Sequence, residues 1–301
     1  MKSGNVLVTV VIPVFNTAEY LNEAIGSILR QTLQELEIVA IDDCSSDNSL
    51  QILRELAAAD SRIKVIAMPQ NQGQSVCRNK GLEIAKGEYI YFFDSDDILE
   101  EDCLQLCYEK CTELQTDLLL FDGKSFTENG ISLEFNPKYD RTGFFTKSVS
   151  TGLETIETMY KNKAYSCSVC LIFIRKSYLD QTGLRFYPGV FYEDVLFSML
   201  LYLQAKRVSS IRRTFFHRRI RSNSVMTSRL SHRNINDRIL ICNELLSNKK
   251  NFSDPTSRHL LNLEVRNMMK FLVKNAIIGK HYKLLFSYLN QILALFLKTF
   301  S

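Results

Sequence analysis

Three carboxylates, Asp94, Asp96 and Asp97, stand within four positions, directly after the aromatic and β-branched run at residues 89–93. The run has the composition of a buried strand. Because alternate residues of an extended chain face the same way, Asp94 and Asp96 can point to one spot. Converging carboxylates repel each other unless a cation lies between them, and Mg²⁺ or Mn²⁺ prefers oxygen ligands and keeps positions open for phosphate. We therefore predict that Asp94 and Asp96 bind a divalent metal, which in turn binds a diphosphate.

The alternative for this stretch is structural. Asp97 would then cap a helix that begins near Ile98, and the other two carboxylates would be solvated turn residues. The elements that surround the stretch decide between the two interpretations.

Apolar, β-branched runs alternate with helical patterns for about 120 residues. The sequence predicts strands at 6–14, 36–41, 63–68, 89–93 and 117–121. It predicts a helix capped by Thr17 with its apolar face at 20–29, a helix with its inward face at 50–57, and helices at 73–85 and 98–114. Such alternation indicates an α/β fold, with a parallel sheet between two layers of helices. Ligands of these sheets bind beyond the carboxyl ends of the strands, which is where Asp42-Asp43 and Asp94 to Asp97 fall.

The loop at residues 13–17 contains no glycine, which argues against a dinucleotide-binding fingerprint, and the chain has no phosphate-binding P-loop motif. Residues 123–152 are polar and turn-rich, so a hairpin or loop excursion is expected there. Helices follow at 153–161, 176–181 and from Glu193, with strands at 168–175 and 208–216 and a basic, polar segment at 217–224.

Two or three helices are expected from residue 231 to the end, with apolar stripes at 260–273 and 284–297. Lys280, Lys283 and Lys298 flank the second stripe. The simplest interpretation is a helical appendage packed on the main domain. The alternative is a face that lies on a membrane surface or on a partner.

Composition sets further limits on the 301-residue chain, which is 46% hydrophobic and 23% charged. A net charge of +4 is too weak to indicate a nucleic-acid partner. No apolar run reaches the roughly 20 residues of a membrane span. The first five residues lead directly into a strand and do not form a signal peptide, so we expect a cytoplasmic protein whose eight cysteines are reduced. Cys167 and Cys170 have metal-site spacing but no second pair to complete a site.

Five ordered segments resemble the bacterial family 2 glycosyltransferases with the GT-A fold. They are VVIPVFN at 10–16, DDCSSD at 42–47, NQGQS at 71–75, RNKG at 78–81 and GEYIYFFDSDD at 87–97. The resemblance covers the first 120 residues and continues through Glu193-Asp194 and the segment at His217. It implies a GT-A domain at 1–230, with a nucleotide-binding half at 1–122 and an acceptor-binding half at 123–230. The helical extension at 231–301 lies outside the resemblance.

The resemblance implies a reaction as well as a fold. It implies an inverting, hexosyltransferase-type enzyme that moves a sugar from a nucleotide-diphosphate sugar, often a UDP-sugar, with Mg²⁺ or Mn²⁺. The acceptor would be a hydroxyl of a glycan or lipid-linked molecule in cell-surface polysaccharide synthesis. A peripheral position at the inner face of the plasma membrane, through the C-terminal helices, and a homodimer are both compatible with this function.

Individual roles follow from the same resemblance. Asp96 would be the main metal ligand, and Asp94 would contact ribose or metal. Asp42 or Asp43 would accept a hydrogen bond from the base, and Arg78 would reach the phosphates or the sugar. The full substrate-binding set is Pro13, Phe15, Asn16, Asp42, Asp43, Arg78, Asp94, Ser95, His217 and Arg218. The last two would lie near the diphosphate, with His217 as a further metal ligand.

Catalysis also needs a base, because an acceptor hydroxyl is a poor nucleophile until its proton is taken. In the resemblance this base is Asp194. Glu193 would orient it or contact the acceptor, although two acids at a helix start also interact favourably with the macrodipole. Relatives often carry a tryptophan before this pair, and this chain has none. We expect Tyr165, Phe191 and Tyr192 to stack on the acceptor instead.

Two other functions share part of these features. A nucleotidyltransferase also needs carboxylates and a metal at a sheet end, but it would carry a Gly-rich basic loop after the first strand, which is absent here. A non-catalytic sugar-nucleotide-binding or assembly subunit would have no need of Asp194.

Overall fold

The first strands form a parallel sheet that is buried on both faces. In the computed structural model, which describes residues 5–127, 139–221 and 230–300, β1 (Val8–Val14) lies between β2 (Leu36–Asp42) and β4 (Tyr89–Phe92). The next strand outward is β3 (Ile63–Ala67), parallel to β2. All of β2 and all of β1 except Pro13 are buried, as their continuous apolar sequence predicts. The carboxyl ends of β1, β2 and β4 therefore lie at one edge.

The later strands extend the same sheet. Within the described residues, eight strands follow the order β3-β2-β1-β4-β7-β6-β8-β5. Strand β7 (Ile172–Arg175) is antiparallel to both β4 and β6 (Leu118–Thr127). Strand β8 (Val208–Ile220) runs parallel to β6, and the short β5 (Ile98–Leu99) pairs antiparallel with β8. The expected α/β fold with a mostly parallel sheet is confirmed.

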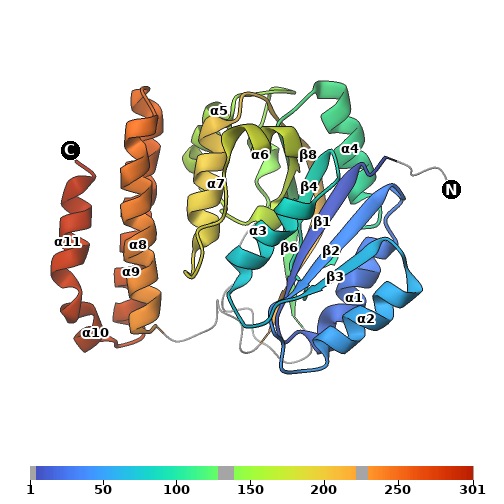
Figure 1. The fold of residues 1–301 in the computed structure, drawn as a ribbon. Coiled ribbons are helices and arrows are strands. Elements are labelled where there is room, and N and C mark those ends of the chain that lie inside the picture. The colour runs from blue at the N-terminus through green and yellow to red at the C-terminus, as the bar shows by residue number, and fades with distance from the viewer. Residues whose placement is uncertain (1–4, 128–138, 222–229, 301) are drawn as a thin grey trace.

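Helices cover both faces of the sheet (Figure 1). They are α1 (Ala18–Leu29), α2 (Ser49–Ala59), α3 (Gln74–Ile84), α4 (Cys103–Leu114), α5 (Gly152–Lys161), α6 (Lys176–Thr182) and α7 (Glu193–Gln204). Helix α3 packs very tightly on β1, because a Cβ atom at Gly81 would lie 2.3 Å from Cγ1 of Val11. Only glycine allows this approach. Two short 3₁₀ turns, Thr142–Phe144 and Val169–Leu171, complete this part of the chain.

The C-terminal helices form a separate layer beside α7 (Figure 1). They are α8 (His232–Ser247), α9 (Pro255–Ile278), α10 (Tyr282–Ser287) and α11 (Leu289–Lys298), with a 3₁₀ turn at Asn248–Asn251. The predicted break before α9 is sharp: Asp254 accepts the N–H of Ser257 at 2.7 Å, and Pro255 opens the helix. Among the described residues, no helix is both long and apolar enough to cross a bilayer.

Two expectations about these elements were wrong. A single helix at 98–114 is not present: Ile98–Leu99 pairs with β8, and the helix begins at Cys103. Asp97 therefore does not cap a helix at Ile98; its Oδ1 accepts the N–H of Arg219 at 2.8 Å. The expected excursion at 123–152 begins later, because β6 continues to Thr127 along β8. Residues 128–138 of that excursion, and 222–224 of the basic segment, lie outside the described residues.

Candidate active site

The first loop is fixed to the loop after β2. Asn16 has a φ of 51°, which asparagine tolerates better than most residues. Its Oδ1 accepts the N–H of Ser46 at 2.8 Å, and its own N–H donates to Ser45 Oγ at 3.1 Å. Beside it, the Phe15 ring is 46% exposed, whereas Pro13 is half-buried in β1. Phe15 is thus the member of this loop with a free face for a ligand ring.

The two carboxylates after β2 have different environments. Asp43 accepts the backbone N–H groups of Gln72, at 2.8 Å, and Gly73, at 2.7 Å, so it fixes the loop that leads into α3. Asp42 accepts the N–H of Ser45 at 3.2 Å through Oδ2. Its buried Oδ1 has no hydrogen-bond donor among the described residues. Asp42 or Asp43 is predicted to accept a hydrogen bond from the nucleotide base. Of the two, Asp42 has a carboxylate oxygen that no described donor uses.

Arg78 of α3 connects two other acidic positions. It is only 3% exposed, and its guanidinium lies 5.2 Å from the centre of the Phe186 ring. Nη1 donates to Glu193 Oε1 at 2.8 Å, and Nη2 donates to Asp94 Oδ1 at 2.9 Å. Burial lowers the pKa of Arg78, but the charges of Asp94 and Glu193 raise it by more, so the guanidinium stays charged. Both terminal nitrogens are used on carboxylates, so Arg78 positions acids and contacts no open surface.

Glu193 is the more deeply buried acid of its pair, at 1% exposed. Besides Arg78, it accepts from Gln74 Nε2 at 2.5 Å, and its Oε2 has no donor among the described residues. Burial and then the charge of Asp194 raise the pKa of Glu193 to about 7, against the opposing effect of Arg78. Of the two roles expected for Glu193, this burial favours orienting its neighbour over contact with the acceptor.

Asp194 lies in the first turn of α7 and remains partly exposed. Its Oδ1 accepts the N–H of Val195 at 2.9 Å, and the Cys167 thiol donates to Oδ2 at 3.3 Å. Burial raises the pKa of the Asp194 carboxyl above its ordinary value, the Asp94 charge adds to this, and Arg78 opposes it. A partly exposed carboxylate with a raised pKa is suited to accept a proton.

Asp94 and Asp96 can be tested as ligands of a divalent cation. Burial and then the negative charge of Asp94 raise the pKa of Asp96. No group of three or more His, Cys, Asp or Glu side chains suitable for a metal occurs among the described residues. Mg²⁺ needs only one or two carboxylates when phosphates and water complete its shell, so this pair fits. Asp96 Oδ2 accepts from Arg221 Nε at 2.5 Å, a contact that a metal would have to displace.

Ser95, between these carboxylates, joins the loop after β4 to the loop after β1. Ser95 is buried, and its hydroxyl lies 2.9 Å from the Thr17 hydroxyl, directly after the first loop. The end of β4 and the end of β1 are thereby held together. Ser95 thus contributes to the predicted donor site by fixing the backbone that presents Asp94 and Asp96.

The structure separates His217 from Arg218. His217 Nε2 lies 2.7 Å from Glu100 Oε1, and burial followed by the Lys124 charge lowers the pKa of the imidazole. It is not brought to Asp94 and Asp96, so the predicted role of His217 as a further metal ligand finds no support in this geometry. Pairing of β8 with β5 turns its ring toward Glu100.

Arg218, by contrast, belongs to the acidic cluster. Its Nη1 contacts the Tyr139 hydroxyl, and its charge lowers the pKa of Asp96. Two further arginines that the sequence patterns did not single out also meet this cluster. Arg221 pairs with Asp96, and Arg219 Nε donates to the Asp96 carbonyl at 2.9 Å. In the sequence, only the basic composition of residues 217–224 indicates a role for these two arginines.

Helix α8 holds the segment that leads into Glu193 and Asp194. Asp237 Oδ2 accepts the N–H of Phe191 at 3.0 Å, and the Arg238 guanidinium lies 4.0 Å from the centre of the Tyr192 ring. Arg233 covers the Phe191 ring at 4.5 Å. Tyr192 has a φ of 68°, an uncommon value for a tyrosine. Both rings were expected to stack on the acceptor. In the structure, arginines of α8 stack on them. No motif or periodicity in the sequence signals this contact.

The third ring expected at the acceptor also has a protein partner. Tyr165 stacks on Tyr160 with 4.7 Å between ring centres, and its buried hydroxyl has no hydrogen-bond partner among the described residues. Tyr160 in turn contacts Glu264 of α9. Nearby, Cys167 is a free thiol, as are the other seven cysteines, all of which lie in the described part of the chain.

Comparisons with known proteins agree with this architecture. A model of the family described as Glycosyl transferase family 2 matches residues 9–181. The glycosyltransferase GlyA of Streptococcus pneumoniae serotype 4 is 31% identical over 220 residues, which are 72% of this chain and 31% of that protein. Poly(ribitol-phosphate) beta-glucosyltransferase of Bacillus spizizenii is 30% identical over 210 residues, 67% of this chain and 30% of that protein. The chain thus spans about a third of the length of these relatives.

A solved structure matches nearly the whole chain. The crystal structure of S. aureus TarS residues 1–349 in complex with UDP-GlcNAc superposes with a TM-score of 0.74 and 25% identity. The match covers 96% of this chain and 79% of that one. It therefore extends well beyond residue 181, where the family model ends.

Proposed function

Because the chain belongs to glycosyl transferase family 2, we propose that it transfers a sugar from a nucleotide-diphosphate sugar to a hydroxyl group, with inversion at the transferred carbon. One observation carries this proposal: Arg78 joins Asp94, at the carboxyl end of β4, to Glu193, whose neighbour is Asp194. A donor-side acid and a candidate base are thereby tied to one side chain. The UDP-GlcNAc complex of TarS supports a UDP-sugar as the first donor to test.

The donor would lie at the sheet edge. We infer that Phe15 stacks on the base, with Asp42 or Asp43 accepting its ring N–H. Asp96 and Asp94 would hold Mg²⁺ or Mn²⁺, and the bound metal would neutralise charge on the departing diphosphate. The Arg78 contact keeps Asp94 in one orientation, and Arg218 adds positive charge beside the same carboxylates. These side chains bind and orient the donor, so that the sugar faces Asp194.

Asp194 would act as the general base. The acceptor oxygen bonds to the transferred carbon, the bond from that carbon to the diphosphate oxygen breaks, and the hydroxyl proton passes to Asp194. The raised pKa of Asp194 favours this uptake. Glu193, held by Arg78 and Gln74, would fix the start of α7 and with it the direction of the Asp194 carboxylate.

We infer that the acceptor is a glycan or a lipid-linked molecule in cell-surface polysaccharide synthesis. The relative named as a poly(ribitol-phosphate) beta-glucosyltransferase supports this class. Such a reaction would place the protein in the cytoplasm at the inner face of the plasma membrane. The C-terminal helices are the candidate contact, and a second copy of the chain is the competing occupant of the same face.

A thermal-shift screen of nucleotide sugars, with and without Mn²⁺, tests the donor site. A ligand that binds only the folded state raises Tm. We expect a UDP-sugar to raise Tm more with Mn²⁺ than without it, and Asp96→Ala to abolish the difference. Asp180→Ala, a substitution of a surface ion-pair residue, is the matched control. An equal shift in wild type with and without the metal would contradict the metal role.

A further inference from the structure

The last helices expose most of the large apolar side chains that are exposed in the described part of the chain. Among the described residues, eleven such side chains are exposed, and nine of them belong to the last 31 positions. We call these nine the C-terminal apolar face: Phe271, Ile277, Ile278, Tyr282, Phe286, Leu289, Leu293, Leu297 and Phe300. Phe286 and Leu297 are the most exposed of those in α10 and α11, at 78% and 70%. Single exposed apolar residues are normal on proteins, but a concentration of this kind marks a contact surface.

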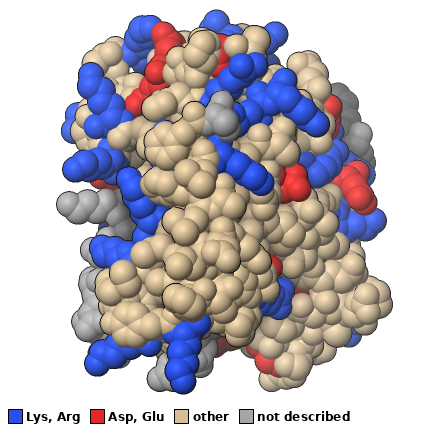
Figure 2. Space-filling model, turned by 90° about the vertical axis from the view of Figure 1, so that its left-hand side faces the viewer, with Lys and Arg blue, Asp and Glu red and all other residues tan. Residues whose placement is uncertain are grey.

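Helix α11 shows why intramolecular packing does not account for this face. Ile292 and Leu295 point inward and are buried, so one side of α11 already packs on the other helices. Leu289, Leu293 and Leu297 recur every four residues and form an outward stripe. Helix α11 is thus apolar on both sides but packs through only one, so its other apolar side stays exposed. Figure 2 shows a broad area on this side of the molecule that is mostly tan, with Lys and Arg and a few Asp and Glu atoms around it.

The charge of this region is one-sided. Glu264 is the last acidic residue of the chain, and no Asp or Glu occurs from 265 to 301. The same 37 positions contain six basic residues: Arg266, Lys270, Lys274, Lys280, Lys283 and Lys298. The five lysines are exposed. The rest of the chain mixes both signs, since the whole chain has 37 basic and 33 acidic residues.

We propose that the C-terminal apolar face docks on the surface of an anionic lipid bilayer. Its aromatic and leucine side chains would enter the boundary between headgroups and acyl chains, and its lysines would meet anionic headgroups. A symmetric dimer through this face fits less well, because an isologous interface would bring the same lysines close to each other, and residues 265–301 contain no acid. The charge pattern thus favours a lipid surface over a second copy.

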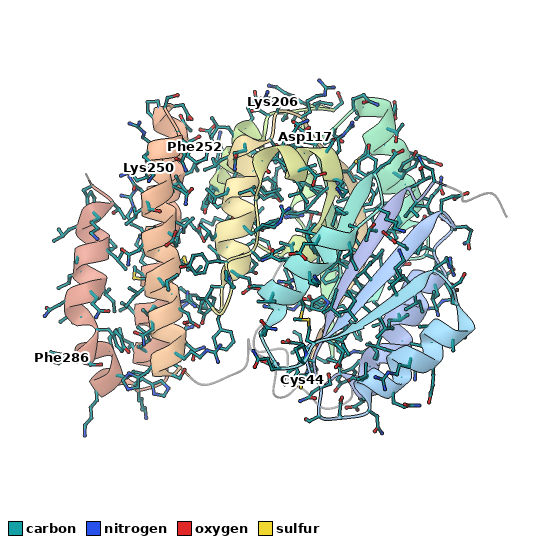
Figure 3. The ribbon with its side chains drawn as sticks, viewed as in Figure 1. Cys44, Asp117, Lys206, Lys250, Phe252 and Phe286 are labelled. Atoms are coloured by element: carbon teal, nitrogen blue, oxygen red, sulfur yellow. The ribbon has the colours of Figure 1, made fainter. Side chains whose placement is uncertain are left out.

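The position of the face suits a lipid-linked acceptor, a point that rests on the proposed function. In Figure 3, Phe286 of α10 and Cys44, just beyond the carboxyl end of β2, both lie at the lower end of the molecule. Asp117 and Lys206 lie at the opposite end. A bilayer below and beside α10 would therefore be at the end of the molecule where the strands present their acidic residues.

Co-sedimentation with vesicles tests the docking itself. The probes are vesicles of phosphatidylcholine alone and of phosphatidylcholine with about 30% phosphatidylglycerol, without nucleotide sugar or acceptor. We expect the full chain to bind the anionic vesicles at least tenfold more tightly, and less tightly as salt increases. The triple variant Phe286→Ser, Leu293→Gln, Leu297→Gln should lose at least tenfold in binding. Phe144→Ser, at an exposed aromatic residue elsewhere, is the control and should bind like wild type.

A charge reversal separates the lysines from the apolar stripe. The double variant Lys280→Glu, Lys283→Glu should weaken binding to anionic vesicles about as strongly as the triple variant does. The control is Lys86→Glu with Lys206→Glu, which makes the same change in net charge at exposed sites elsewhere and should have little effect. Asp194→Asn should bind vesicles normally, so failure of the transferase proposal would not affect this result. Equal binding of both vesicle types, or of the triple variant and wild type, would overturn the proposal. One further result would overturn it: wild type is a dimer without lipid, the triple variant is a monomer, and neither protein binds vesicles.

Discussion

Arg78 holds Glu193 Oε1 at 2.8 Å and Asp94 Oδ1 at 2.9 Å with two nitrogens of one guanidinium. One residue of α3 therefore fixes the end of β4 and the start of α7 relative to each other. Since Asp194 follows Glu193, the spacing between the predicted donor site and the candidate base depends on this bridge.

Arg78→Met should destabilise the fold by about 3–5 kcal/mol, the usual cost of removing one partner of a buried ion pair. Glu193 would be left buried with Gln74 as its remaining described partner. Adding Glu193→Gln should restore part of the loss, because no buried charge then remains unpaired. Urea denaturation measures both variants, with Arg54→Met, on an exposed face of α2, as the control. Strictly additive effects would mean that the two residues are not coupled.

Asp194→Asn should lower the rate of transfer by roughly 10² to 10⁴, the range expected when a general base is lost. Donor affinity should stay within twofold, because the substitution keeps the shape of the side chain and Asp194 is not one of the predicted donor-binding residues. Initial rates and calorimetric titration with the nucleotide diphosphate measure the two quantities. Asp180→Asn should change neither. Near-normal turnover in the Asp194 variant would remove this residue from the mechanism.

The stability of the protein should depend on Glu193 between about pH 4.5 and 7. Its pKa rises from an ordinary 4.5 to about 7 in the folded chain. In that interval the folded protein retains a proton that the unfolded chain has lost, so the free energy of unfolding falls as pH increases and then levels off. Glu193→Gln removes this titration. We expect the difference in Tm, variant minus wild type, to grow from pH 4.5 to 7; a difference that does not change with pH would contradict the assignment.

Asp237→Ala should lower kcat about tenfold with little change in the KM of the donor. Its carboxylate holds the Phe191 N–H, and the released segment leads into Asp194, where small displacements are costly. Asp237→Asn should recover most of the activity, since an amide oxygen can accept the same N–H. Steady-state kinetics with varied donor distinguishes this from general destabilisation, with Asn243→Ala on α8 as the control. A parallel loss of kcat and donor affinity would argue against a positioning role.

The acidic edge of the sheet was predictable because it depends on local patterns. Continuous apolar runs mark buried parallel strands, and the residues after them must lie at one edge. The position of Asp42 and Asp43 after β2, and of Asp94 and Asp96 after β4, at one edge of the sheet follows from that rule. The error at 98–114 has the opposite origin. Ile98–Leu99 is too short to show a strand pattern, and it is a strand only because β8, more than 100 residues later, lies beside it.

The remaining misses also depend on contacts between distant segments. The sequence 217–221 is basic, but which of its side chains meets an acid depends on how β8 pairs with β5 and β6. The contact of Asp237 with Phe191 joins α8 to a loop 46 positions earlier, outside any motif. The roles of the individual site residues, and the division of the chain at residue 231, remain predictions.

Gly81 lies one helical turn from Arg78, and its missing side chain is what lets α3 rest directly on Val11. A single added methyl group there would push the helix off the sheet and carry the guanidinium with it. The positions of Asp94, after β4, and of Glu193, in α7, would then both change, although no reacting atom had been altered. The absence of a side chain at Gly81 thus sets how far the Arg78 guanidinium reaches toward Asp94 and Glu193.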